Sequence, residues 1–126
     1  MSAPKPTDAE LAILHVLWKH GRSTVREVHD RITESRSVAY TTTLKLMQIM
    51  TAKGTLRRNE EQRAHVYEAV QPAEKTKRQL ALDVLQRVFD GSASQLMMHA
   101  LADRKASKEE VDELRRLLND YERKLR

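Results

Sequence analysis

The feature that most constrains the fold of this chain is a change of hydrophobic period at Gly54. Before it, apolar residues recur every three or four positions, which is typical of amphipathic helices. After it the helical period is lost, and two short segments, 55–58 and 64–70, flank the polar stretch 59–63, which is typical of two strands joined as a hairpin. The pattern therefore predicts helices followed by a β-hairpin within residues 7–71 of the 126-residue chain.

Local end signals divide the helical part into three helices. Thr7 with Glu10, and then Thr24 with Glu27, form Thr-x-x-Glu capping boxes, in which a hydroxyl and a carboxylate bond the free N–H groups of a helix start. A glycine follows the first and the third helix, as is common at helix ends. The expected helices cover about 7–20, 24–35 and 39–53, with a short link at 22–24 that also suits a strand, and the expected strands cover 55–58 and 64–70.

Three helices and a hairpin in this order are typical of a winged helix-turn-helix domain, in which the second helix supports the third. The third helix would lie in the major groove of DNA, and the hairpin, or wing, would reach the neighbouring backbone. Hydroxyls at the start of the third helix can bond bases or phosphates, and Lys45 suits a phosphate. The candidate DNA-binding residues are Arg22, Arg36, Tyr40, Thr41, Thr42, Lys45, Arg57, Arg58, Arg63 and His65.

The net charge permits DNA binding without establishing it. The chain holds 23 Lys and Arg against 18 Asp and Glu, a formal charge of +5, and many surfaces are as basic as this. Two ordinary alternatives stay open: the threonines could simply cap the third helix, and the arginines could be solvated turn residues. A third alternative is a winged-helix module that binds another protein and no operator.

The sequence gives no indication of an enzyme, a metal site or a cofactor. It has no cysteine, which excludes disulfides, thiolate zinc sites and thiol redox chemistry. The five histidines form no metal-ligand spacing, and no nucleophile motif or glycine-rich phosphate loop is present. Residues 1–6 lack the apolar stretch of a signal peptide and are expected to form a flexible leader. No stretch is long and apolar enough to span a membrane, so a cytoplasmic protein is expected.

Residues 72–126 are predicted to form a helical dimerisation domain. Helices are expected over about 73–89, 94–103 and 107–124, the last opened by a capping box of Ser107 and Glu110. From Val111 to Leu125 apolar residues recur at steps of 3, 4, 3 and 4, as in a heptad seam. Such stripes usually face their own domain, but these bury so little surface alone that a second copy is the expected partner. The candidate dimerisation residues are Leu80, Val84, Val88, Leu96, Val111, Leu114, Leu118 and Tyr121.

Several stretches together resemble the penicillinase repressor family, which includes the BlaI, MecI and CopY types. The matching segments include Thr7–Leu14 and Thr24–Val28, and the most specific is Ala39–Leu44 at the start of the third helix. Arg63–Tyr67 resembles the wing, and Phe89–Ser92 with the last helix resembles the dimerisation region. The resemblance covers about residues 7–122.

The resemblance implies a mainly α, winged-helix homodimer that represses β-lactam-resistance or related stress genes at a palindromic DNA operator. In the penicillinase branch, a membrane sensor-transducer with a metalloprotease domain acts as partner, and the repressor is cleaved in its C-terminal region. The Asn-Phe bond cut in well-known relatives corresponds here to the neighbourhood of His99 and Ala100, which mark the candidate proteolytic-switch region. Two further departures are the absence of a cysteine-rich tail, which excludes thiolate copper sensing, and Ile49, where many relatives carry a basic residue.

Overall fold

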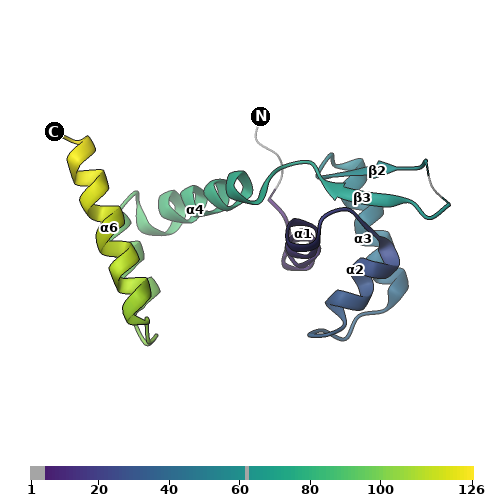
Figure 1. Cartoon of the computed structure of the whole chain (residues 1–126), viewed down its shortest axis with the longest axis horizontal. Helices are drawn as coiled ribbons and strands as arrows, with labels where there is room; N and C mark the ends of the chain where they lie inside the picture. Colours follow the sequence, from purple (N-terminus) through teal and green to yellow (C-terminus); the bar gives the residue numbers. More distant parts are fainter. Residues whose placement is uncertain (1–4, 62) are drawn as a thin grey trace. The chain divides into compact units, whose positions relative to one another are not determined.

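The computed structural model describes residues 5–61 and 63–126, so most of the expected leader, residues 1–4, lies outside the described residues. The chain divides into two compact units, one ending at Ala81 and one running from Leu82 to Arg126. The elements in chain order are α1 (Asp8–His20), β1 (Ser23–Thr24), α2 (Val25–Ile32), α3 (Tyr40–Ala52), β2 (Leu56–Asn59), β3 (Val66–Ala69), α4 (Ala73–Phe89), α5 (Ala93–Leu101) and α6 (Lys108–Lys124) (Figure 1).

The first two helices begin at the capping boxes that the sequence predicts. The Thr7 N–H donates to Glu10 at 2.9 Å, and the Glu10 N–H donates to the Thr7 hydroxyl at 3.2 Å. The box of Thr24 and Glu27 at the start of α2 has the same two distances. Gly21, at φ 79°, ends α1 in a backbone conformation that side chains disfavour.

Helix α2 ends at Ile32, three residues before the predicted end near Ser35. The N–H groups of Ser35 and Arg36 both donate to the Ile32 carbonyl, which closes tight turns in place of a further helical turn. The prediction was too long here because polar residues 33–35 carry no apolar side chain that would hold another turn against the core.

Helix α3 begins without a side-chain cap, since its N-cap residue is Ala39. The neighbouring threonines therefore do not cap this helix, which removes one of the ordinary explanations for them. Gly54, at φ 84°, follows the helix, and the chain turns into a three-stranded antiparallel sheet of order β1-β3-β2. The register pairs Ser23 with Tyr67 and Leu56 with Ala69. Strand β2 has the predicted length but is shifted by one residue toward the turn, whereas β3 is shorter than the predicted strand 64–70.

One hydrophobic core joins the three helices to the sheet. Ile13, Val28, Met47 and Met50 are fully buried at its centre. Leu56 on β2 and Tyr67 on β3 close it from the sheet side. The order of elements, the sheet and this core confirm the predicted mainly α fold with a β-hairpin wing.

The second unit consists of Leu82–Phe89 of α4 together with α5 and α6. Asp90 (φ 50°) and Gly91 (φ 83°) separate α4 from α5. The third predicted capping box is only half formed: the Ser107 hydroxyl accepts from the Glu110 N–H, but the Glu110 carboxylate accepts from Arg104 at 3.0 and 3.2 Å instead. The structure describes every residue from Leu82 to Arg126, and none of them is buried. Within the described residues, no helix has the length and apolar character needed to cross a membrane.

Candidate nucleic-acid interface

The amino-terminal turn of α3 presents polar side chains to solvent, as the sequence predicts. Thr41, Thr42 and Lys45 are exposed. Thr43 points into the core instead, where it is 1% exposed and its hydroxyl lies 3.1 Å from Nδ1 of His29. Tyr40 is only half-buried. The helix therefore offers two hydroxyls and one ammonium on a single exposed face, while its opposite face packs on the core.

Two side chains of α2, Arg26 and His29, contact the Tyr40 ring. The Arg26 guanidinium carbon lies 4.3 Å from the ring centroid, a cation–π stack. The His29 ring meets the Tyr40 ring almost perpendicularly, at 87°, with centroids 5.5 Å apart. Sequence reasoning did not single out Arg26 or His29, although their spacing of three places them on the same face of α2.

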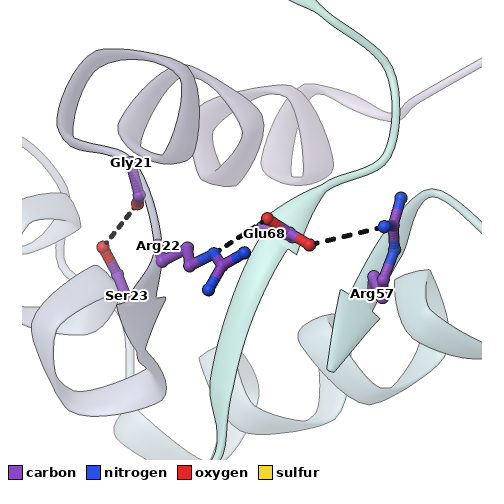
Figure 2. A network of polar contacts seen from close by, with 5 residues as sticks. All are labelled: Gly21, Arg22, Ser23, Arg57 and Glu68. Carbon is purple, nitrogen blue, oxygen red and sulfur yellow. Dashed lines mark hydrogen bonds and ion pairs between the residues drawn. The ribbon is translucent and has the colours of Figure 1, made fainter. Parts of the chain in front are cut away.

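An ion-pair network lies across the sheet. Figure 2 shows Glu68 of β3 between Arg22, which precedes β1, and Arg57 of β2. The Glu68 carboxylate lies 3.1 Å from Nε of Arg22 and 3.6 Å from an amino group of Arg57. The Ser23 hydroxyl donates to the Gly21 carbonyl at 2.9 Å, which fixes the backbone on both sides of Arg22. Glu68 is a third residue that sequence reasoning missed, and its alternation with buried Tyr67 was the available signal.

The other wing residues lie nearer the turn of the hairpin. Arg58 lies opposite Tyr67 in the strand register and forms an ion pair with Glu60. A hydrogen bond with Tyr67 and the charge of Glu60 raise the pKa of Arg58 above its ordinary value, so its positive charge is secure. Arg63 and His65 are exposed in the loop between β2 and β3.

Two further positions bear on the α3 surface: Arg36, which precedes the helix, and Ile49, which lies on it. Arg36 is exposed in the segment that leads from α2 to α3. Ile49, the apolar departure from the family pattern, is 38% exposed on α3. The first unit thus carries the predicted cations at the junctions of α2 and α3 and on the wing. Whether each of them contacts DNA stays a prediction.

A partly buried ion pair connects α1 to the carboxyl end of α3. Nζ of Lys53, which caps α3, lies 3.2 Å from the Glu10 carboxylate of α1, and the two side chains are 39% and 4% exposed. Burial raises the pKa of Glu10, but hydrogen bonds from Thr7 and Lys53 together with the Lys53 charge outweigh it, so the pKa is lowered. Glu10 is therefore a charged group inside the protein that holds the carboxyl end of α3 against α1.

The second unit exposes much of its predicted seam. Val84, Val88, Leu118 and Tyr121 are exposed, the last two by 66% and 63%. The other candidates in this set are half-buried: Leu96, Val111 and Leu114 in this unit, and Leu80, which belongs to the first unit. Further exposed apolar side chains extend the same helices, namely Leu82, Met97, Met98, Leu101, Leu117 and Leu125.

The candidate switch region lies in the last turns of α5. His99 and Ala100 are both exposed, and the His99 ring lies 5.6 Å from the Phe89 ring of α4. In the part of the chain that the structure describes, no group of His, Cys, Asp and Glu side chains could hold a metal ion.

Comparison with known proteins agrees with this arrangement. The family model described as "Penicillinase repressor" matches residues 6–120. The chain is 30% identical to a protein named "Transcriptional regulator BlaI" from Mycobacterium tuberculosis, over 91% of this chain and 83% of that protein. It is 25% identical to a protein named "Penicillinase repressor" from Bacillus licheniformis, over 94% of this chain and 92% of that protein.

Proposed function

Because the chain belongs to the penicillinase repressor family, a family of transcriptional repressors and not of enzymes, we propose that it represses transcription as a homodimer bound to a palindromic DNA operator. Helix α3 occupies the major groove and the β2–β3 wing follows the adjacent backbone. The relative named as a penicillinase repressor suggests genes of β-lactam resistance or a related stress response as targets. Such a protein works in the cytoplasm, where the DNA is.

The observation that carries this proposal is the exposed amino-terminal turn of α3. Thr41 and Thr42 do not cap the helix, because its N-cap residue is Ala39 and no side chain forms a capping hydrogen bond there. Their hydroxyls can bond base edges, and their methyl groups can contact a thymine methyl. Lys45, one turn further along the same exposed face, suits a phosphate that sets the position of the helix.

The wing cations suit the same duplex. Arg57 and Arg58 lie on β2, and Arg63 and His65 lie in the loop toward which that strand leads. Phosphate contacts of this kind supply affinity that does not depend on base sequence. The proposal therefore assigns base reading to α3 and backbone binding to Lys45 and the wing.

The second unit is proposed to pair with a second copy of the chain. Its 45 residues bury no side chain, although α4, α5 and α6 carry a row of exposed apolar residues. A unit this small is marginally stable by itself, and leaving so many apolar side chains in water is unfavourable. A two-fold dimer would also place two α3 helices on successive turns of DNA, which corresponds to a palindromic operator.

Release from the operator is proposed to follow a signal that acts on α5. Cleavage between His99 and Ala100 by a membrane-bound sensor metalloprotease would cut the chain before α6. This bond lies within the helix, which ends at Leu101. A protease needs an extended substrate, so the last turn of α5 would have to unfold first. Helix ends open at small free-energy cost.

Salt dependence of duplex binding tests the proposal. The wild-type protein should bind duplex DNA at 50 mM salt and lose affinity steeply by 200 mM, because each phosphate contact releases counterions. A genomic pull-down should then recover a palindromic site. Absence of duplex binding at low salt would contradict the proposal and favour a module that binds another protein.

A further inference from the structure

Arg26 differs from Arg22, Arg57 and Arg58 in what contacts its guanidinium. Arg22 and Arg57 both form ion pairs with the Glu68 carboxylate, and Arg58 forms one with Glu60. No carboxylate of the described residues forms an ion pair with Arg26, which instead lies on the Tyr40 ring at 4.3 Å. Among the described residues its guanidinium thus has an aromatic partner but no ion-pair partner, and its side chain is exposed.

The Tyr40 ring is itself held in place from α2. The His29 ring packs against it in a T-shaped arrangement, with the ring planes at 87°, and Nδ1 of the same histidine lies 3.1 Å from the hydroxyl of buried Thr43. Arg26 and His29 are one turn apart on α2, as Tyr40 and Thr43 are on α3. The four side chains form a polar contact between the two helices at the amino-terminal end of α3.

A guanidinium lying on a ring keeps its N–H groups available at the rim of its plane. Arginine stacks in this way and binds phosphate with its planar fork, whereas lysine lacks the plane. Holding the group in advance reduces the side-chain entropy lost on binding. In helix-turn-helix proteins the helix that precedes the recognition helix crosses the DNA backbone. In this chain that helix is α2, which carries Arg26.

We propose that Arg26 contacts a DNA phosphate and that the Tyr40 ring is the platform that presents it. This inference rests on the proposed function and deepens it, because it adds α2 to the interface. It also assigns the aromatic ring of Tyr40, and not its hydroxyl, to DNA binding. The contact positions the protein on DNA and does not read base sequence.

Binding to an operator duplex and to an unrelated duplex, measured from 50 to 200 mM salt, tests the inference. The slope of log affinity against log salt is negative, and Arg26→Ala should make it less steep by about 0.9, the value for one phosphate contact. The advantage of wild type over this variant should then shrink roughly 3.5-fold across the range, equally for both duplexes. Arg31→Ala removes the same charge from another exposed position of α2 and should leave the slope unchanged.

The platform has its own test at Tyr40. Tyr40→Phe keeps the ring and should retain the wild-type slope. Tyr40→Leu removes the ring without changing the charge, yet it should make the salt slope less steep by nearly as much as Arg26→Ala does. Combining the two substitutions should change the slope little beyond the effect of Arg26→Ala alone. Thermal melting of each variant checks that it is folded. Arg26→Ala is expected to keep the fold, because the residue is exposed.

Three results would overturn the inference: an unchanged slope for Arg26→Ala, equal losses for Tyr40→Phe and Tyr40→Leu, or equal losses for Arg26→Ala and Arg31→Ala. Each of these leaves the proposed function intact, since the wild type still binds DNA in a salt-dependent way. Failure of the wild type to bind any duplex would instead contradict the proposed function itself.

Discussion

Replacing Glu10 by glutamine measures how far the position of α3 depends on its contact with α1. The chain provides a matched control, because Glu27 forms a capping box with the same distances, 2.9 and 3.2 Å. Glu27 is exposed, whereas the Glu10 side chain is 4% exposed and also pairs with Lys53 at 3.2 Å. The difference between the two variants therefore isolates burial and the Lys53 contact from capping.

The expected magnitude follows from these contacts. Glutamine keeps an acceptor for the backbone N–H, but two hydrogen bonds to a charged carboxylate become neutral or are lost, and such bonds contribute about 1.5–3 kcal/mol each against about 1 for neutral ones. We expect Glu10→Gln to lower the free energy of unfolding by about 2 kcal/mol. For a domain of this size that corresponds to roughly 8–16 °C in Tm. Glu27→Gln should cost no more than about 0.5 kcal/mol, because water replaces the lost charge interaction.

Thermal and urea unfolding of both variants provides the assay, with Lys53→Met and its double variant with Glu10→Gln completing a cycle. Equal Tm shifts for Glu10→Gln and Glu27→Gln would refute the reasoning, because burial would then contribute nothing. A coupling near zero between Glu10 and Lys53 would remove the ion pair from the explanation and leave burial of the cap alone.

The contribution of Glu10 to stability should also depend on pH. The pKa of Glu10 in the folded protein lies below its ordinary value of 4.5. A lowered pKa contributes stability that is present in full above the ordinary value and is lost as the pH falls through the folded value. The stability gap between wild type and Glu10→Gln should therefore narrow below about pH 4.5. A gap that stayed constant down to pH 2 would show that the charge of Glu10 is not involved.

Three further changes test the proposed interface. Lys45→Ala should weaken binding to all duplexes by one common factor and make the salt slope less steep by about 0.9; a loss confined to one operator would argue for base contact. Glu68→Gln should free Arg22 and Arg57 and so strengthen binding to any duplex at low salt, and unchanged affinity in a gel-shift titration would place both arginines away from DNA. Leu118→Asp, at a position 66% exposed, should raise the dimer dissociation constant roughly 30-fold or more, whereas Asn119→Asp beside it should not; light scattering that gave equal masses would count against this seam.

Much of the fold could be predicted because its signals are local. A threonine and a glutamate three residues apart define the starts of α1 and α2. The glycines after α1 and α3 mark where those helices stop, and the change of period after α3 predicts the hairpin. Each signal acts within one turn or one strand, so it can be read without knowing what the element packs against.

Where the local signals were incomplete, the predictions went wrong. Helix α2 stops at Ile32 because nothing apolar follows that could pack on the core. Glu110 fits the capping pattern with Ser107, but Arg104, six residues earlier in the chain, takes its carboxylate instead. A capping box requires only short-range geometry, so a competing charge from a loop cannot be foreseen from the pattern alone.

The candidate site shows the same division. The exposure of Thr41, Thr42 and Lys45 follows from helical periodicity and could be predicted. The contact of Arg26 with Tyr40 required the packing of α2 on α3, and the sharing of Glu68 by two arginines required the register of three strands, which brings together residues 46 apart in the chain.

The change of period at Gly54 and the capping boxes thus determined, from sequence alone, that helices precede a wing and where two of those helices begin. Tertiary structure decided which cations are held by carboxylates and which one lies free of them on an aromatic ring. The physical reason is range: helix caps and periodicity depend on neighbours within four positions, whereas ion pairs and ring contacts depend on which distant elements the core brings together.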